Sequence, residues 1–187
     1  MHFKREEFFT IPNLMGYFRL LLIPVFAWRY LTAGTREEYL AAAVIVGISG
    51  LTDLFDGKIA RHFHQVTELG KFLDPLADKL TQGVVILCLA SRFSWLRVLL
   101  VLFILKEGFM GIMGLVMLHH NGRKLDGAKW YGKVCTALLY TVMFLVLFFP
   151  DLPSFAVQGL ICLCGGVMVL TWAAYLPVFH RMWQEKA

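Results

Sequence analysis

Charged residues are scarce in this sequence of 187 residues: they make up 17%, against 58% hydrophobic residues. A soluble domain is typically about half apolar and about a quarter charged, so this shortage excludes the water-soluble globular, disordered and fibrous classes. The sequence also lacks internal repeats, low-complexity segments and domain linkers. At roughly 20 apolar residues for each bilayer crossing, the length accommodates about six membrane helices joined by short loops, and no large domain outside the membrane.

The sequence also lacks a combination of cysteine and histidine that could bind zinc. The spacing of Cys162 and Cys164 leaves that pair on different faces of a helix, and no histidine or further cysteine completes a metal-binding set beside them. We therefore expect all four cysteines to be small buried hydrophobic residues. They are Cys88, Cys135, Cys162 and Cys164.

Long apolar runs separated by short polar segments predict six membrane-spanning helices. These helices are expected over residues 12–34, 38–61, 67–91, 95–119, 130–149 and 153–179. Residues 1–9 are charged and amphipathic, and would form either a helix lying in the membrane interface or a cytosolic tail. The sequence thus predicts an all-α integral membrane protein with six transmembrane helices, a short N-terminal amphipathic interfacial helix, and a single domain over residues 1–187.

The net charge of +5 is explained by the orientation of a membrane protein, so no nucleic acid is expected as a partner. Lys and Arg gather in cytoplasmic loops, and here they gather on one side of the predicted helices. That side carries Lys4, Arg5, Lys58, Arg61, Lys71, Arg123, Lys124, Lys129, Lys133, Arg181 and Lys186, and the other side carries Arg36, Arg92 and Arg97. We expect a multi-pass protein of the cell membrane with both termini in the cytoplasm.

The most informative stretch covers residues 53–79, where four aspartates interrupt the apolar background. Asp53 and Asp56 are i, i+3 near the end of the second predicted helix, and Asp74 and Asp78 are i, i+4 early in the third. Each pair shares one helix face, and a short turn makes the two helices antiparallel neighbours, so the four carboxylates can converge. Bare carboxylates would repel one another. Their oxygens suit Mg²⁺ or Mn²⁺, and two such ions can clamp a phosphoryl group.

Two residues beside the aspartates suit a phosphate. Gly57 would let a phosphate approach the backbone closely, and Arg61 could offer it a bidentate fork. The alternative interpretation is an interfacial salt-bridge network, in which the carboxylates pair with Lys58, Arg61, Lys71 and Lys79. We favour the metal site, because acids within a membrane usually have a function and four of them surround a glycine and an arginine.

This stretch resembles the signature of the CDP-alcohol phosphotransferase family, which also has six membrane spans. The signature reads D-x-x-D-G-x-x-A-R, then a gap of eight residues here, then G-x-x-x-D-x-x-x-D. The sequence matches all its fixed positions, with Asp53, Asp56, Gly57, Ala60, Arg61, Gly70, Asp74 and Asp78. The resemblance therefore covers a specific motif and essentially the whole chain.

The resemblance implies a reaction in which an acceptor hydroxyl attacks the β-phosphorus of a CDP-linked donor and CMP leaves. It implies that Asp53, Asp56 and Asp74 bind two metal ions, and that Asp78 is both a metal ligand and the base for the acceptor hydroxyl. The contacts to the CDP diphosphate would be Gly57, Ala60, Arg61 and Gly70. The resemblance also implies a homodimer in the lipid membrane, with one site in each protomer.

Three further segments resemble the corresponding segments of one branch of the family, whose members make phosphatidylglycerophosphate or cardiolipin. In this sequence the segments are Leu73-Asp74-Pro75-Leu76-Ala77-Asp78-Lys79, Ile11-Pro12-Asn13-Leu14 with Arg19, and Gly132-Lys133-Val134 with Thr136. Both activities use CDP-diacylglycerol as donor. The acceptor is expected to be sn-glycerol 3-phosphate, with phosphatidylglycerol as the alternative that would yield cardiolipin.

One departure from this branch concerns the acceptor phosphate. Members that use glycerol phosphate usually carry Arg-Glu in the fourth span and a second Arg beyond it, whereas this sequence has Lys106-Glu107 and then Gly114. Lys106 could still bind a phosphate as a point charge. Four basic residues of the following loop could supply the missing charge, or could simply obey the positive-inside rule: Arg123, Lys124, Lys129 and Lys133.

Two questions stay open from the residues alone. Arg19 lies within the first predicted span, where a charge is costly, so it either reaches the active-site cavity or pairs with Glu107. A protein of a different class, a small divalent-cation transporter, could use the aspartates as an ion path. The phosphate-binding elements between Gly57 and Arg61 argue against that transporter.

Overall fold

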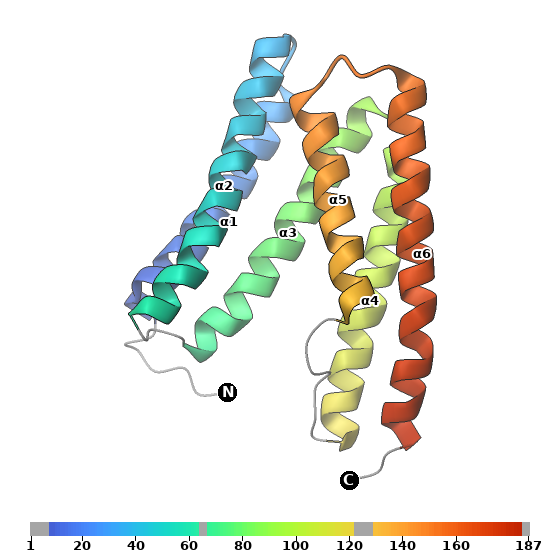
Figure 1. The fold of residues 1–187 in the computed structure, drawn as a ribbon. Coiled ribbons are helices and arrows are strands. Elements are labelled where there is room, and N and C mark those ends of the chain that lie inside the picture. The colour runs from blue at the N-terminus through green and yellow to red at the C-terminus, as the bar shows by residue number, and fades with distance from the viewer. Residues whose placement is uncertain (1–7, 64–66, 122–128, 185–187) are drawn as a thin grey trace. The chain divides into compact units, whose positions relative to one another are not determined.

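The computed structural model describes residues 8–63, 67–121 and 129–184. The six predicted helices are confirmed (Figure 1), and their bounds are α1 Ile11–Leu31, α2 Arg36–His62, α3 Glu68–Arg92, α4 Leu96–Asn121, α5 Trp130–Phe148 and α6 Ser154–Gln184. The chain divides into two compact units, Met1–Ser91 and Arg92–Ala187. Helices α1, α2 and most of α3 form the N-terminal unit, and α4, α5 and α6 form the C-terminal unit.

Two helix ends differ from the prediction by three residues or more. Helix α1 ends at Leu31 instead of residue 34, because Gly34 already takes part in the start of α2: its N–H donates to Glu38 Oε2 at 2.7 Å. Helix α6 continues to Gln184, beyond the predicted end at residue 179. The prediction ended this helix where its uncharged run ends, but a polar residue such as Arg181 does not terminate a helix.

Helix α2 begins with a capping box that fixes its entry from α1. Thr35 Oγ1 accepts a hydrogen bond from the Glu38 N–H at 3.3 Å, and Glu38 Oε2 accepts one from the Thr35 N–H at 3.1 Å. These two bonds satisfy backbone donors that a helix start otherwise leaves without partners. From this turn α2 packs along α1, and Figure 1 shows the two helices side by side.

In the C-terminal unit α6 packs against both α4 and α5. The start of α5 lies closely on α6, because the hydroxyl of Tyr175 accepts a hydrogen bond from the Lys129 N–H at 3.1 Å. A β-carbon at Gly132 would collide with the same hydroxyl. Tyr175 also forms a buried cluster with Met117 of α4 and with Phe179. Glycine at position 132 thus allows α5 and α6 to approach at this end.

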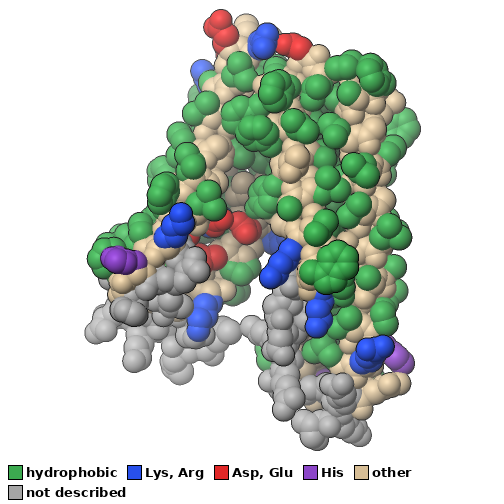
Figure 2. Space-filling view, viewed as in Figure 1, with side chains coloured by type: hydrophobic (Ala, Val, Ile, Leu, Met, Phe, Trp, Pro, Cys, Tyr) green, Lys and Arg blue, Asp and Glu red, His purple; other side chains and the backbone are tan. Residues whose placement is uncertain are grey.

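The helices have the apolar surface of a membrane protein. In the described part of the chain, α1, α2, α4, α5 and α6 are long and apolar enough to cross a membrane. Helix α3 has a comparable length of 25 residues, but its charged and amide residues between Lys71 and Gln82 lower its hydropathy. Large apolar side chains such as Leu115 and Phe155 are exposed, and Figure 2 shows hydrophobic side chains over much of the visible helix surface. Such a surface requires lipid around it.

Two smaller predictions have different outcomes. Cys88, Cys135 and Cys164 are buried as expected, but Cys162 is exposed, so the prediction was wrong there. Cysteine is apolar enough to be stable on a lipid-facing helix surface as well as in a core. The predicted amphipathic segment over residues 1–9 falls mostly on residues 1–7, which lie outside the described residues. Phe8 and Phe9 are described, in a short and exposed 3₁₀ turn.

Candidate active site

The four aspartates of the predicted site come from two helices of the N-terminal unit. Asp53 and Asp56 lie toward the C-terminal end of α2, and Asp74 and Asp78 lie in the first half of α3. Both segments are α-helical, so each pair shares a helix face. Figure 2 shows one group of acidic side chains partway along this unit, separate from the acidic side chains at the top of the picture. We refer to Asp53, Asp56, Asp74 and Asp78 as the aspartate cluster.

The guanidinium of Arg19, in α1, binds three members of the aspartate cluster. Its Nη1 lies 2.5 Å from Asp53 Oδ1 and 3.4 Å from Asp56 Oδ2. Its Nη2 lies 2.6 Å from Asp78 Oδ1. One planar cation therefore joins α1 to carboxylates of both α2 and α3. Of the two roles that the sequence left open for Arg19, these contacts support the one inside the acidic site.

The cluster has a buried side and an accessible side. The side chains of Arg19 and Asp56 are only 3% and 5% exposed, whereas those of Asp53 and Asp78 are 38% and 36% exposed. A ligand arriving at the cluster would therefore meet Asp53 and Asp78 first. Asp56 and Arg19 form the back of the site, where the low dielectric strengthens electrostatic interactions.

Asp74 completes the cluster without belonging to the three ion pairs of Arg19. It is half-buried, and it interacts electrostatically with Arg19, Asp53 and Asp78. Since Asp74 lies one helical turn before Asp78, it presents its carboxylate on the same face of α3. All four predicted carboxylates therefore lie in one charged cluster.

The donor chemistry of this cluster fits a divalent metal ion of the magnesium type. All its ligand atoms are carboxylate oxygens, which Mg²⁺ and Mn²⁺ prefer. Three carboxylates lie around a single guanidinium, so they can also approach a single cation. Within the described residues, however, no three Asp, Glu, His or Cys side chains are grouped closely enough to hold a metal as they stand. The cation among the aspartates is Arg19.

The alternative interpretation was a salt-bridge network in which the aspartates pair with Lys58, Arg61, Lys71 and Lys79. Of these residues, Lys79 donates from Nζ to Gln82 Oε1 at 3.5 Å, and Lys58 Nζ lies 6.0 Å from the ring centre of Phe55. The side chain of Arg61 lies outside the described part of the structure. Arg19, a residue of α1 that this interpretation did not include, forms ion pairs with Asp53, Asp56 and Asp78.

The start of α3, which carries half of the cluster, is held by a small polar contact with α1. Thr67 precedes the helix, and its hydroxyl accepts a hydrogen bond from the Gly70 N–H at 2.9 Å, as an N-cap residue does. The amide of Asn13, which is 2% exposed, donates to the same hydroxyl at 3.0 Å. A β-carbon on Gly70 would lie 2.8 Å from Asn13 Oδ1. Glycine at position 70 therefore lets α3 start against Asn13.

The sequence reasoning missed this contact. The predicted third helix already began at residue 67, and threonine is a preferred N-cap residue, so the capping role of Thr67 could have been inferred from the sequence. Its contact with Asn13 spans 54 positions of the chain, and no local pattern predicts it. The steric role of Gly70 adds to the diphosphate contact that the resemblance implies, and that contact stays a prediction.

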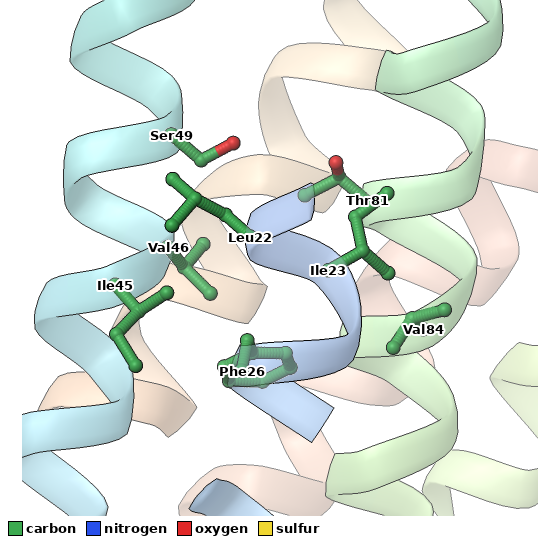
Figure 3. Close-up of a pocket in the computed structure, with 8 residues that line it drawn as sticks. All are labelled: Leu22, Ile23, Phe26, Ile45, Val46, Ser49, Thr81 and Val84. Atoms are coloured by element: carbon green, nitrogen blue, oxygen red, sulfur yellow. The ribbon is translucent and has the colours of Figure 1, made fainter. Parts of the chain in front are cut away.

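A pocket with apolar walls lies deeper between the same three helices (Figure 3). It is lined by Leu22, Ile23, Phe26, Ile45, Val46, Ser49, Thr81 and Val84. Ser49 lies about one helical turn before Asp53, and Thr81 lies about one turn after Asp78, so the pocket begins about one turn away from the aspartate cluster along α2 and α3. Its lining offers two hydroxyls and no charged group.

The other predicted residues are distributed over both units. Gly57, Ala60 and Arg61 continue α2 beyond Asp56. In the C-terminal unit, Lys106 is 6% exposed and its Nζ lies 2.6 Å from Glu107 Oε1. Lys129 and Lys133 are exposed at the start of α5. Arg123 and Lys124 lie outside the described residues.

The sequence matches one protein-family model and is similar to several named bacterial proteins. The family model described as CDP-alcohol phosphatidyltransferase matches residues 9–178. A protein of Pectobacterium atrosepticum is 32% identical over 178 residues, which are 94% of this chain and 92% of that protein. Proteins of Escherichia coli K12 and Shigella flexneri serotype 5b are each 30% identical over 146 residues, or 77% of this chain and 80% of theirs. All three are named CDP-diacylglycerol–glycerol-3-phosphate 3-phosphatidyltransferase.

Proposed function

Because this chain belongs to the CDP-alcohol phosphatidyltransferase family, we propose that it transfers the phosphatidyl group of CDP-diacylglycerol to sn-glycerol 3-phosphate and releases CMP. The observation that carries the proposal is the convergence of Asp53, Asp56 and Asp78 on one cationic group. That site lies in a chain that resembles proteins named for this reaction over most of its length.

The reaction exchanges one phosphorus–oxygen bond for another. The acceptor hydroxyl oxygen bonds to the phosphorus that carries the diacylglycerol. The bond from that phosphorus to the bridging oxygen breaks, and CMP leaves with the bridging oxygen and its electron pair. The hydroxyl proton must pass to a base. Positioned carboxylates perform such a transfer when they lie within hydrogen-bond reach of the hydroxyl.

Asp78 suits the role of this base. Its Oδ1 is held by Arg19, so the carboxylate has a fixed orientation while Oδ2 takes no part in that ion pair. Its side chain is 36% exposed, which leaves room for an acceptor from the aqueous phase. Asp53 has a similar exposure and lies across the site on α2.

Members of this family depend on divalent metal ions, and two ions, Mg²⁺ or Mn²⁺, would be held here by Asp53, Asp56, Asp74 and Asp78. When bound, such ions neutralise the diphosphate and stabilise the departing CMP. The protein's part is to keep four carboxylates on adjacent faces of α2 and α3. The Thr67–Asn13 contact at the start of α3 contributes to that register.

The remaining roles concern the two substrates. Gly57, Ala60, Arg61 and Gly70 are proposed to contact the CDP diphosphate. Lys106 and the basic residues of the α4–α5 connection are proposed to bind the phosphate of the acceptor: Arg123, Lys124, Lys129 and Lys133. The exposure of Lys129 and Lys133 supports this role, whereas Lys106 would have to exchange its contact with Glu107 for the phosphate.

The same proposal includes the surroundings of the enzyme. The protein is a multi-pass membrane protein, proposed to lie in the cell membrane with its site and both termini facing the cytoplasm, as a homodimer with one site in each protomer. A site at the membrane boundary lets the donor keep its acyl chains in the bilayer while a polar acceptor arrives from water. The basic side of the chain supports this orientation.

An acceptor panel tests the proposal. Purified full-length protein in detergent receives CDP-diacylglycerol, Mg²⁺ or Mn²⁺ and one acceptor, and CMP and lipid masses are measured together, with Asp78→Asn as control. Phosphatidylglycerophosphate formed from glycerol 3-phosphate is the expected product. Cardiolipin formed from phosphatidylglycerol would reassign the acceptor, in line with the replacement of arginine by Lys106 and Gly114. Release of no CMP from folded protein, together with metal flux in liposomes, would favour the divalent-cation transporter.

A further inference from the structure

We propose that Arg19 is a resident counter-cation of the aspartate cluster, which holds Asp53, Asp56 and Asp78 together in the metal-free protein and competes with the divalent ion that binds there. This inference rests on the proposed function, because it takes the aspartates to be the metal ligands. It makes Arg19 a positioning residue that acts through the carboxylates.

The contacts of Arg19 are directed at the aspartates. Both terminal nitrogens of its guanidinium are used, and together they reach three carboxylates on two helices. Its third nitrogen, Nε, is buried and has no hydrogen-bond partner among the described residues. An arginine held by a general polar network would use that donor as well. The side chain is thus held by the carboxylates themselves.

Burial makes this arrangement electrostatically demanding. Arg19 and Asp56 are almost completely buried in helices that cross the membrane, where an unpaired charge of either sign is very unfavourable. Each therefore needs an opposite charge while no metal is bound. Arg19 supplies one positive charge to three carboxylates, and Asp74 adds a fourth carboxylate to the same cluster. A divalent ion bound there would meet more carboxylates than this one guanidinium pairs with.

The metal and the guanidinium would both bind the same three carboxylates. The contacts of Arg19 engage Asp53 Oδ1, Asp56 Oδ2 and Asp78 Oδ1, and a Mg²⁺ or Mn²⁺ ion at these carboxylates would draw on the same negative charge. A divalent ion close to a guanidinium also repels it strongly at short range. Arg19 therefore stabilises the metal-free protein more than the metal-bound protein.

Thermodynamic linkage predicts the direction in which loss of the Arg19 charge changes the affinity for the metal. A group that stabilises one of two states lowers the affinity of any ligand that binds the other state. Removal of the charge of Arg19 should therefore raise the affinity for the metal and lower the stability of the metal-free protein. A purely structural role predicts the opposite sign for the metal, because carboxylates that are no longer held together bind it less tightly.

The test uses Mn²⁺ as the probe and full-length protein in detergent, without substrate. Arg19→Gln removes the charge, and Arg19→Lys keeps a charge but loses the fork that reaches both helices. Arg29→Gln is the matched control, since Arg29 is an exposed arginine of the same helix. Free Mn²⁺ is measured by electron paramagnetic resonance during titration, and the melting temperature is measured with chelator and with saturating Mn²⁺.

We expect Arg19→Gln to lower the Mn²⁺ dissociation constant by at least about tenfold, because a full unit charge beside the ion has been removed. The constant for Arg19→Lys should fall by a smaller factor, and that for Arg29→Gln should not change. The melting temperature of Arg19→Gln in chelator should fall, and saturating Mn²⁺ should raise it by more than it raises that of the wild type. If Arg19→Gln does not fold, the direction of the change in Arg19→Lys decides.

Other results overturn the proposal in distinguishable ways. Unchanged or weaker Mn²⁺ binding by folded Arg19→Gln and Arg19→Lys, with normal binding by the wild type, would refute the role of Arg19 and leave the metal site intact. The absence of saturable Mn²⁺ binding in the wild type and in every variant would refute both the metal site of the proposed function and the competition.

Discussion

Gly70 lies so close to Asn13 that a β-carbon at position 70 would be 2.8 Å from Asn13 Oδ1. This approach joins the start of α3 to the start of α1, and Thr67 takes part in it through its hydroxyl. Asp74 follows Gly70 by one helical turn. The position of the face of α3 that carries the proposed metal ligands therefore depends on a contact that contains no acidic residue.

Gly70→Ala should destabilise the protein, because backbone and side-chain atoms at the start of α3 must shift to admit a methyl group. A cost of about 1–3 kcal/mol is typical of such overpacking. The change in melting temperature measures it, with Gly50→Ala as control, since nothing lies within 4 Å of a β-carbon at Gly50. Asn13→Ala in the same chain should recover part of the loss. Equal effects of Gly70→Ala and Gly50→Ala would contradict the steric role.

Thr67→Ala should lower both stability and activity. Loss of an N-cap side chain costs about 0.5–2 kcal/mol, and here the cap also positions the helix that carries Asp74 and Asp78. Thr35→Ala is the matched variant, because Thr35 caps α2 at the end away from the aspartates. We expect both variants to melt at lower temperature, and only Thr67→Ala to lower kcat/KM for CDP-diacylglycerol. A similar decrease of kcat/KM in both would show that general destabilisation is the cause.

Gly132→Ala should destabilise the C-terminal unit through the hydroxyl of Tyr175, which a β-carbon would meet. A double-mutant cycle with Tyr175→Phe isolates this contact. Gly132→Ala should cost less when Tyr175 is already phenylalanine, because the oxygen that collides is gone. Gly159→Ala is the control, as nothing lies within 4 Å of a β-carbon there. If the effects of Gly132→Ala and Tyr175→Phe on stability are additive, the destabilisation by Gly132→Ala does not come from the collision with the Tyr175 hydroxyl.

The helices and the aspartate cluster could be predicted from the sequence because both depend on local rules. Apolar run length accounts for most of the helices, and helical periodicity puts Asp53 with Asp56 and Asp74 with Asp78. Phe179, where the uncharged run ends, was a poor guide to the end of α6, since a helix that leaves the membrane has no reason to stop there. The exposure of Cys162 depends on how α6 is rotated, which composition does not encode.

The ion pairs of Arg19 with the aspartates and the contact of Asn13 with Thr67 could not be predicted from the sequence. Both depend on how α1 lies against α2 and α3, and these contacts join residues 34 to 59 positions apart. Two roles were open for Arg19 from the sequence alone, and only packing distinguishes them. Lys106 shows the same limit, because its proposed role in binding the acceptor phosphate depends on tertiary packing.

The most direct test of the central claim measures CMP release from CDP-diacylglycerol with Mn²⁺, in the presence and absence of glycerol 3-phosphate. Wild type, Asp53→Asn and Asp151→Asn are compared, since Asp151 is an exposed aspartate of the other unit. We expect acceptor-dependent CMP release by the wild type and by Asp151→Asn, and a loss of at least about a hundredfold in Asp53→Asn. Retained CMP release by folded Asp53→Asn would contradict catalysis by the aspartate cluster.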